Sequence, residues 1–84
     1  MQYIAGRKDR GDIEICYEPK PTKHGLKIQL TTSVERLYGN AIKKEIARAF
    51  RELGVKSGKV VAIDDGALPY VIQARVEAAV RLSR

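Results

Sequence analysis

The feature that most constrains the fold is a change in hydrophobic period along a short chain. Apolar residues occupy every second position in segments 12–18 and 26–31, which is the spacing of strands with one buried face. From residue 34 to residue 53 they recur every three or four positions, the spacing of a helix with one apolar stripe. Eighty-four residues have room for only one modest core. These faces must therefore pack against one another.

Two further elements follow in the sequence. The β-branched run at residues 60–63 lies between turn residues and predicts a third strand, and Pro69 suits the first turn of a second helix that runs to the C-terminus. We predict a single α+β domain over residues 1–84, a two-layer sandwich of the order strand-strand-helix-strand-helix. It would consist of a small antiparallel or mixed three-stranded sheet with both helices on one face.

The connections complete this prediction. Segments 12–18 and 26–31 are expected to form a hairpin with a seven-residue loop that contains two prolines. The run Thr32-Ser33-Val34-Glu35 has the pattern of a helix capping box, and Gly54 is expected to end that helix. Residues 1–10 are expected to be a basic, flexible N-terminal segment. Nothing in the chain would cover the second face of the sheet, which is therefore a predicted docking surface.

The net charge of +6 is compatible with two classes of partner, nucleic acids and acidic protein surfaces. Basic residues are spread from Arg7 to Arg84, and Tyr17 is the only aromatic residue on a predicted strand, so nucleic-acid binding is not expected. Five basic residues on the first predicted helix are compatible with either a solvated face or a patch for an acidic partner: Arg36, Lys43, Lys44, Arg48 and Arg51. A stand-alone protein- or RNA-interaction domain stays open as the alternative function.

Location and chemistry are constrained by a few residues. Cys16 is the only cysteine and no apolar run is long enough to cross a bilayer, so we expect a cytoplasmic protein without a membrane partner. His24 is the only histidine and lies in a loop, without a partner in the sequence that would make it a catalytic base. Asp64 and Asp65 provide too few ligands for a cation, and we predict that they form a turn. We predict no catalytic residue and no metal site, and hence no enzyme.

Three segments resemble the acyl carrier (gamma) subunit of citrate lyase. They are Ala5-Gly6 with Arg10-Gly11-Asp12-Ile13, then residues 33–42 (SVERLYGNAI), and finally residues 64–68 (DDGAL) running on to 73–78 (QARVEA). Their order and spacing cover nearly the whole chain. The delta subunit of malonate decarboxylase is a more distant relative with the same carrier role.

The resemblance implies a non-catalytic carrier subunit that docks on larger lyase and transferase subunits. In that family, a serine at the position of Arg10 holds a phosphoribosyl-dephospho-coenzyme A arm, and the thiol of the arm carries the acyl group. Tethering raises the effective concentration of the thioester at each active site. Arg10, Gly11 and Asp12 are therefore the candidate cofactor-binding positions.

Arg10 departs from this pattern in the residue that matters most. Its guanidinium has no oxygen with which to form a phosphodiester, and residues 1–21 contain no serine or threonine. We therefore predict no cofactor and a lost attachment site. An arm, and with it a small-molecule acyl group, is expected only if attachment has moved to another hydroxyl, for which the candidates are Ser33, Ser57 and Ser83.

Overall fold

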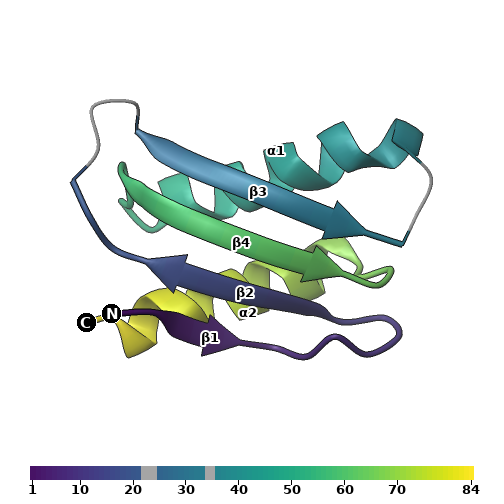
Figure 1. Cartoon of the computed structure of the whole chain (residues 1–84), viewed down its shortest axis with the longest axis horizontal. Helices are drawn as coiled ribbons and strands as arrows, with labels where there is room; N and C mark the ends of the chain where they lie inside the picture. The colour runs from purple at the N-terminus through teal and green to yellow at the C-terminus, as the bar shows by residue number, and fades with distance from the viewer. Residues whose placement is uncertain (22–24, 34–35) are drawn as a thin grey trace.

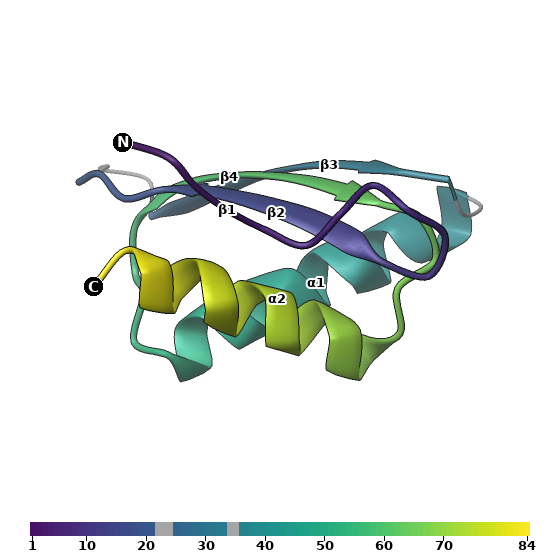
Figure 2. The ribbon, with the colours of Figure 1, turned by 90° about the horizontal axis from the view of Figure 1, so that it is seen from below.

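The computed structural model describes residues 1–21, 25–33 and 36–84, without the side chains of residues 36 and 37. It confirms an α+β sandwich in which one sheet is covered on one face by two helices (Figures 1 and 2). The elements are β1 (Tyr3–Ala5), β2 (Ile13–Glu18), β3 (Leu26–Thr32), α1 (Arg36–Glu52), β4 (Gly58–Asp64) and α2 (Pro69–Leu82). Helix α2 packs on β1 and β2, whereas α1 packs on β3 and on α2.

The prediction of three strands is wrong, because the described residues form a four-stranded sheet in the order β1-β2-β4-β3. The additional strand β1 lies within the segment 1–10, for which no strand was predicted, and its Ile4 pairs with Cys16 of β2. Three residues are too few to show a period of two. Pairing with β2 fixes this strand, and sequence periodicity does not report such pairing.

The predicted hairpin is also wrong. Strand β4 lies between β2 and β3, antiparallel to the first and parallel to the second. The β-branched run of Val60 and Val61 therefore forms part of a central strand, with a partner on each side. Parallel pairing of β3 with β4 requires a long crossover, and α1 supplies it.

The core lies between the sheet and the helices. In β2 the residues predicted to face inward, Ile13, Ile15 and Tyr17, are all buried, and the Tyr17 ring packs 5.1 Å from the Phe50 ring of α1. The other buried apolar residues come from all layers: Ala5, Ile46, Ala49, Val55, Val60, Ala62, Ile72, Val76, Ala79 and Val80. Tyr38, which belongs to the predicted stripe of α1, is 58% exposed, so its side chain lies outside the core.

The sequence predicted a capping residue, Thr32, before α1 and a terminating glycine, Gly54, after it. Gly54 has a φ of +78° and the Val55 amide donates to the Phe50 carbonyl at 3.0 Å, as expected for a glycine that ends a helix. Thr32, in contrast, is the last residue of β3, and its hydroxyl donates to the Asp64 carboxylate at 2.8 Å. A hydroxyl that donates this hydrogen bond can still accept another from a backbone amide, so the capping box stays a prediction. Glu35, the other half of the predicted capping box, lies outside the described residues.

Candidate functional site

The loop that joins β1 to β2 presents Arg10 at an exposed corner. Residues 9–12 form a tight turn in which the Asp12 amide donates to the Asp9 carbonyl at 2.9 Å. Arg10 is the second residue of this turn, and Gly11 is the third, with a φ of +79°. Glycine is favoured there because that backbone conformation is strained for other residues. The side chain at position 10 therefore extends from the tip of the loop toward solvent.

Gly6 holds the start of the loop against β2. Its φ is +86°, and a β-carbon at this position would lie 1.9 Å from the Ile13 carbonyl oxygen. Only a residue without a side chain permits so close an approach. The loop therefore starts from a fixed point.

Asp12 holds the other end of the loop through an ion pair with α2. The Arg75 guanidinium donates from Nε to Oδ1 at 3.0 Å and from Nη2 to Oδ2 at 3.2 Å. The same carboxylate accepts from the Ile13 amide at 2.7 Å and from the Arg7 amide at 3.2 Å. The hydrogen bonds from Arg75, aided by those from the two amides, lower the pKa of Asp12 below its ordinary value of 3.8. Asp12 is thus an anchor for the loop.

Asp64 and Asp65 form the turn that the sequence predicted and connect it to the loop. The Gly11 amide donates to the Asp65 carbonyl at 2.6 Å, and the Asp65 amide donates to the Asp12 carbonyl at 3.0 Å. Buried Asp64 accepts from Thr32 and from the amides of residues 66 and 67. Helix α2 has Leu68 as its N-cap, without a side-chain hydrogen bond, so the aspartates stabilise the turn before the helix and do not cap it.

The candidate hydroxyls differ in their surroundings. Ser33 is exposed and donates to the Asp65 carboxylate at 2.5 Å, so the residue bonded to Gly11 also holds this hydroxyl. Ser83 donates to the Val80 carbonyl at the end of α2, and Ser57 is half-buried just before β4. Through Asp65, Ser33 is therefore the candidate connected to the Arg10 turn.

The open face of the sheet carries the predicted docking surface. Ile4, Cys16 and Val61 form one row across three strands, with Ile63 in the adjacent row. Both helices lie on the other side of the sheet (Figure 2), and the Ile4 side chain is 54% exposed. Cys16 and Val61 are half-buried, so Ile4 is the most exposed apolar side chain of this row.

The loop provides charge and hydrogen-bond donors at its tip but no hydroxyl. Among the described residues no three His, Cys, Asp or Glu side chains gather as metal ligands. His24 lies outside the described residues. Tyr17, the aromatic residue considered for base stacking, is buried against Phe50. In the part of the chain that the structure describes, no helix has the length and apolar character needed to cross a bilayer.

Comparison with known proteins decides the family. The family model of acyl carrier proteins described as malonate decarboxylase delta subunit matches residues 1–83. This chain belongs to that acyl carrier protein family. The citrate lyase acyl carrier protein of Halothermothrix orenii is 41% identical over 75 residues, which are 89% of this chain and 78% of that protein. The one from Streptococcus mutans is 39% identical over 77 residues, covering 92% and 74% of the two chains.

A solved structure agrees with this family. A chain of the Pseudomonas malonate decarboxylase hetero-tetramer, crystallised with malonate, superposes with a TM-score of 0.79 at 26% identity, over 96% of this chain and 81% of that chain. The resemblance stated from the sequence is therefore confirmed. The protein is of the acyl-carrier type and is not a catalyst, as its sequence predicted.

The anchoring of the loop was missed from the sequence. Arg75 was not assigned to a site, and Asp12 was considered only as a flanking position of the attachment residue. Sixty-three residues separate the two partners, so no local pattern reports their ion pair. The one available sign was the presence of both residues in segments that resemble the carrier family.

Proposed function

We propose that this chain is a docking subunit of a lyase or decarboxylase complex that carries no phosphoribosyl-dephospho-coenzyme A at position 10. The observation that carries the proposal is Arg10 at the exposed corner of an anchored turn. The resemblance to the carrier family assigns the attachment serine to this position. The turn is accessible to an attaching enzyme, since Lys8 and Asp9 are exposed beside it. Only the nucleophile is missing.

The chemistry follows from the side chain. Attachment through phosphate needs an oxygen that displaces the leaving group and remains bonded to phosphorus. A guanidinium stays protonated in proteins and offers only N–H donors, so it can form an ion pair with a phosphate but not the ester. The residues of the turn therefore do not fit the covalent group.

The retained role is docking. The Pseudomonas relative belongs to a hetero-tetramer and the other relatives are named as carriers of citrate lyase, which supports larger lyase, transferase or decarboxylase subunits as partners. The row of Ile4, Cys16 and Val61 on the open sheet face supplies a surface for such a partner. A cytoplasmic location is part of the proposal, because Cys16 has no second cysteine with which to pair.

One alternative is favoured by a specific contact. Ser33 is exposed, and Asp65 connects it to the Arg10 turn, so a relocated arm would be expected on this hydroxyl. The chain would then carry an acyl group after all. The hydrogen bond to the Asp65 carboxylate orients the oxygen and would assist removal of its proton.

The intact mass of protein purified from its native host tests the proposal. We expect the mass of the unmodified polypeptide. An added coenzyme A-derived mass on a peptide containing Arg10 would refute the proposal, whereas one on a peptide containing Ser33 would establish the alternative.

Two serine variants test whether the residue at position 10 or the loop as a whole determines attachment of the arm. Co-expressed with a citrate lyase prosthetic-group transferase, Arg10→Ser is expected to gain the arm, and the control Lys8→Ser, in the same exposed loop, is not. If neither variant is modified, the loop itself is not a substrate and the assigned position is wrong.

A further inference from the structure

We infer that the outer edge of β3, together with the adjacent groove on α1, binds an extended acidic segment of a partner protein by strand addition. This inference deepens the proposed docking role and rests on it for the source of the segment. The surface is separate from the open sheet face and from the Arg10 turn.

Strand β3 is an edge strand of the sheet that the described residues form. It pairs with β4 without interruption over seven residues and ends the sheet on the side opposite β1, as Figure 1 shows. The backbone N–H and C=O groups at alternate residues of an edge strand point outward and can pair with another strand. The other edge, β1, is only three residues long. Proteins usually blunt such edges with proline, bulges, short strands or charged side chains, and of these β3 has only one charged residue, Lys27.

The inward side of β3 is incompletely covered. Leu26, Ile28 and Leu30 remain half-buried, whereas the corresponding residues of β4, Val60 and Ala62, are fully buried. An open groove of about 710 Å³ lies between this strand and α1. An added strand at the edge would place alternate side chains over this groove. The groove would thus take apolar side chains from the partner.

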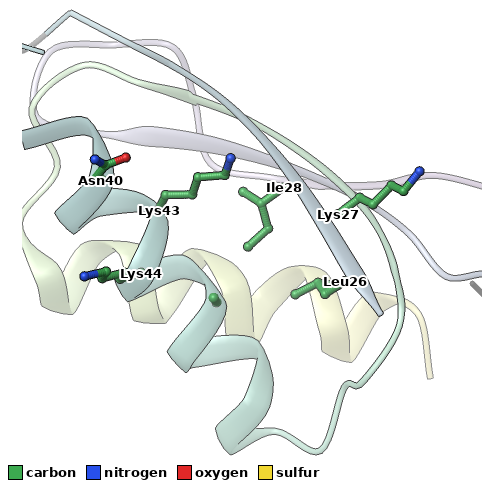
Figure 3. Close-up of a pocket in the computed structure, with 7 residues that line it drawn as sticks. Leu26, Lys27, Ile28, Asn40, Lys43 and Lys44 are labelled. Atoms are coloured by element: carbon green, nitrogen blue, oxygen red, sulfur yellow. The ribbon is translucent and has the colours of Figure 1, made fainter. Parts of the chain in front are cut away.

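The rim of the groove is basic. It is lined mainly by Leu26, Lys27 and Ile28 on β3 and by Asn40, Lys43 and Lys44 on α1. Figure 3 shows the Lys43 side chain extending from α1 toward Ile28. None of these lysines takes part in an ion pair among the described residues, although Arg48 on the same helix pairs with both Glu45 and Glu52.

The positive charge of the groove therefore favours an acidic segment. Lys43 and Lys44 on α1, which take part in no ion pair among the described residues, repel a basic segment and attract an acidic one, and an apolar floor favours alternation of acidic and apolar residues. A single small anion would use the lysines but not the strand edge or the floor. An acidic, extended peptide uses all three features, which is why we favour it.

A defined peptide tests the groove without any partner. An octapeptide of alternating glutamate and valine, titrated into the isotope-labelled full chain, is expected to shift amide resonances of β3 and of residues 40–47, and to slow hydrogen exchange at alternate β3 amides. Lys43→Glu with Lys44→Glu should weaken binding at least tenfold. Lys8→Glu with Lys20→Glu, an equal charge change at exposed sites outside the groove, should weaken it less than threefold.

The result that overturns the inference is equally defined. Resonance shifts without protection of β3, shifts confined to the open sheet face, or an equal loss in both double variants would each contradict it. If inorganic pyrophosphate shifts the same lysines and the peptide does not, the groove is an anion site instead.

A second measurement uses the native complex. Hydrogen exchange at β3 should be at least tenfold slower in the complex than in the free chain, and unchanged exchange there would refute the inference. Failure of the proposed function shows differently, as an arm on Arg10 or Ser33 or as the absence of large co-purifying subunits. In those cases the peptide experiment still decides the groove.

Discussion

Removing the carboxylate of Asp12 should destabilise the domain by detaching the Arg10 turn from helix α2. The carboxylate accepts four hydrogen bonds, two of them from Arg75. Hydrogen bonds to charged groups contribute about 1.5–3 kcal/mol each in favourable sites. The Arg75 side chain is 41% exposed, so solvent screening reduces the contribution of the pair to about 1 kcal/mol.

Three variants separate the contributions. Asp12→Ala removes the ion pair and both amide contacts and is expected to lower the free energy of unfolding by about 2–3 kcal/mol, with a fall in Tm of roughly 10 °C. Arg75→Met keeps most of the apolar contact and should cost about 1 kcal/mol. A double-mutant cycle in urea should give a coupling of about 1 kcal/mol.

The pH dependence of stability tests the Asp12–Arg75 ion pair independently. The pKa of Asp12 is lowered on folding, so its stabilising effect is present above 3.8 and disappears as the pH falls through the lower folded pKa. Asp12→Asn should therefore lose less stability than the parent chain between about pH 5 and pH 2. A coupling below about 0.3 kcal/mol, with identical pH profiles, would show that Arg75 does not anchor the turn.

Three further predictions concern the scaffold. Gly6→Ala should lower the free energy of unfolding in urea by at least about 2 kcal/mol, because the added β-carbon would lie 1.9 Å from a carbonyl oxygen. The control Gly66→Ala, which has open space at a similar φ, should lower it by about 1 kcal/mol. Phe50→Ala should lower the unfolding free energy by about 3–5 kcal/mol, and Tyr70→Ala, which is 70% exposed, should change it by less than about 0.5 kcal/mol. Burial raises the pKa of Tyr17 above 10.0, so its contribution to stability is lost as the pH rises through the folded pKa; tyrosinate absorbance should show one late-titrating tyrosine that Tyr17→Phe removes.

The functional interpretation depends on a single side chain within an otherwise preserved scaffold. Family membership follows from a match along residues 1–83, but chemistry at the tip of the loop follows from position 10 alone. Gly6, Gly11 and Asp12 maintain the shape of the loop whether or not an arm is attached. A carrier fold can therefore persist after attachment is lost, provided that docking still contributes to the complex.

The sequence alone determined that the segments with long apolar patterns are strands and helices, and which face of β2 is buried. Ile13, Ile15 and Tyr17 face the core as their spacing predicted, and Gly54 ends α1. It also determined the chemistry at position 10, because the absence of a hydroxyl there is a property of the residue and needs no structure. These are local properties, which depend on near neighbours and on residue type.

Only the tertiary structure decided how these segments pair. The short strand β1, the insertion of β4 between β2 and β3, and the ion pair of Asp12 with Arg75 all join residues that are distant in sequence. Thr32 is a further example, since its hydroxyl donates to Asp64, 32 residues away on the neighbouring strand. Such contacts depend on which surfaces meet when the core closes, and that free energy is shared among residues that no local pattern connects.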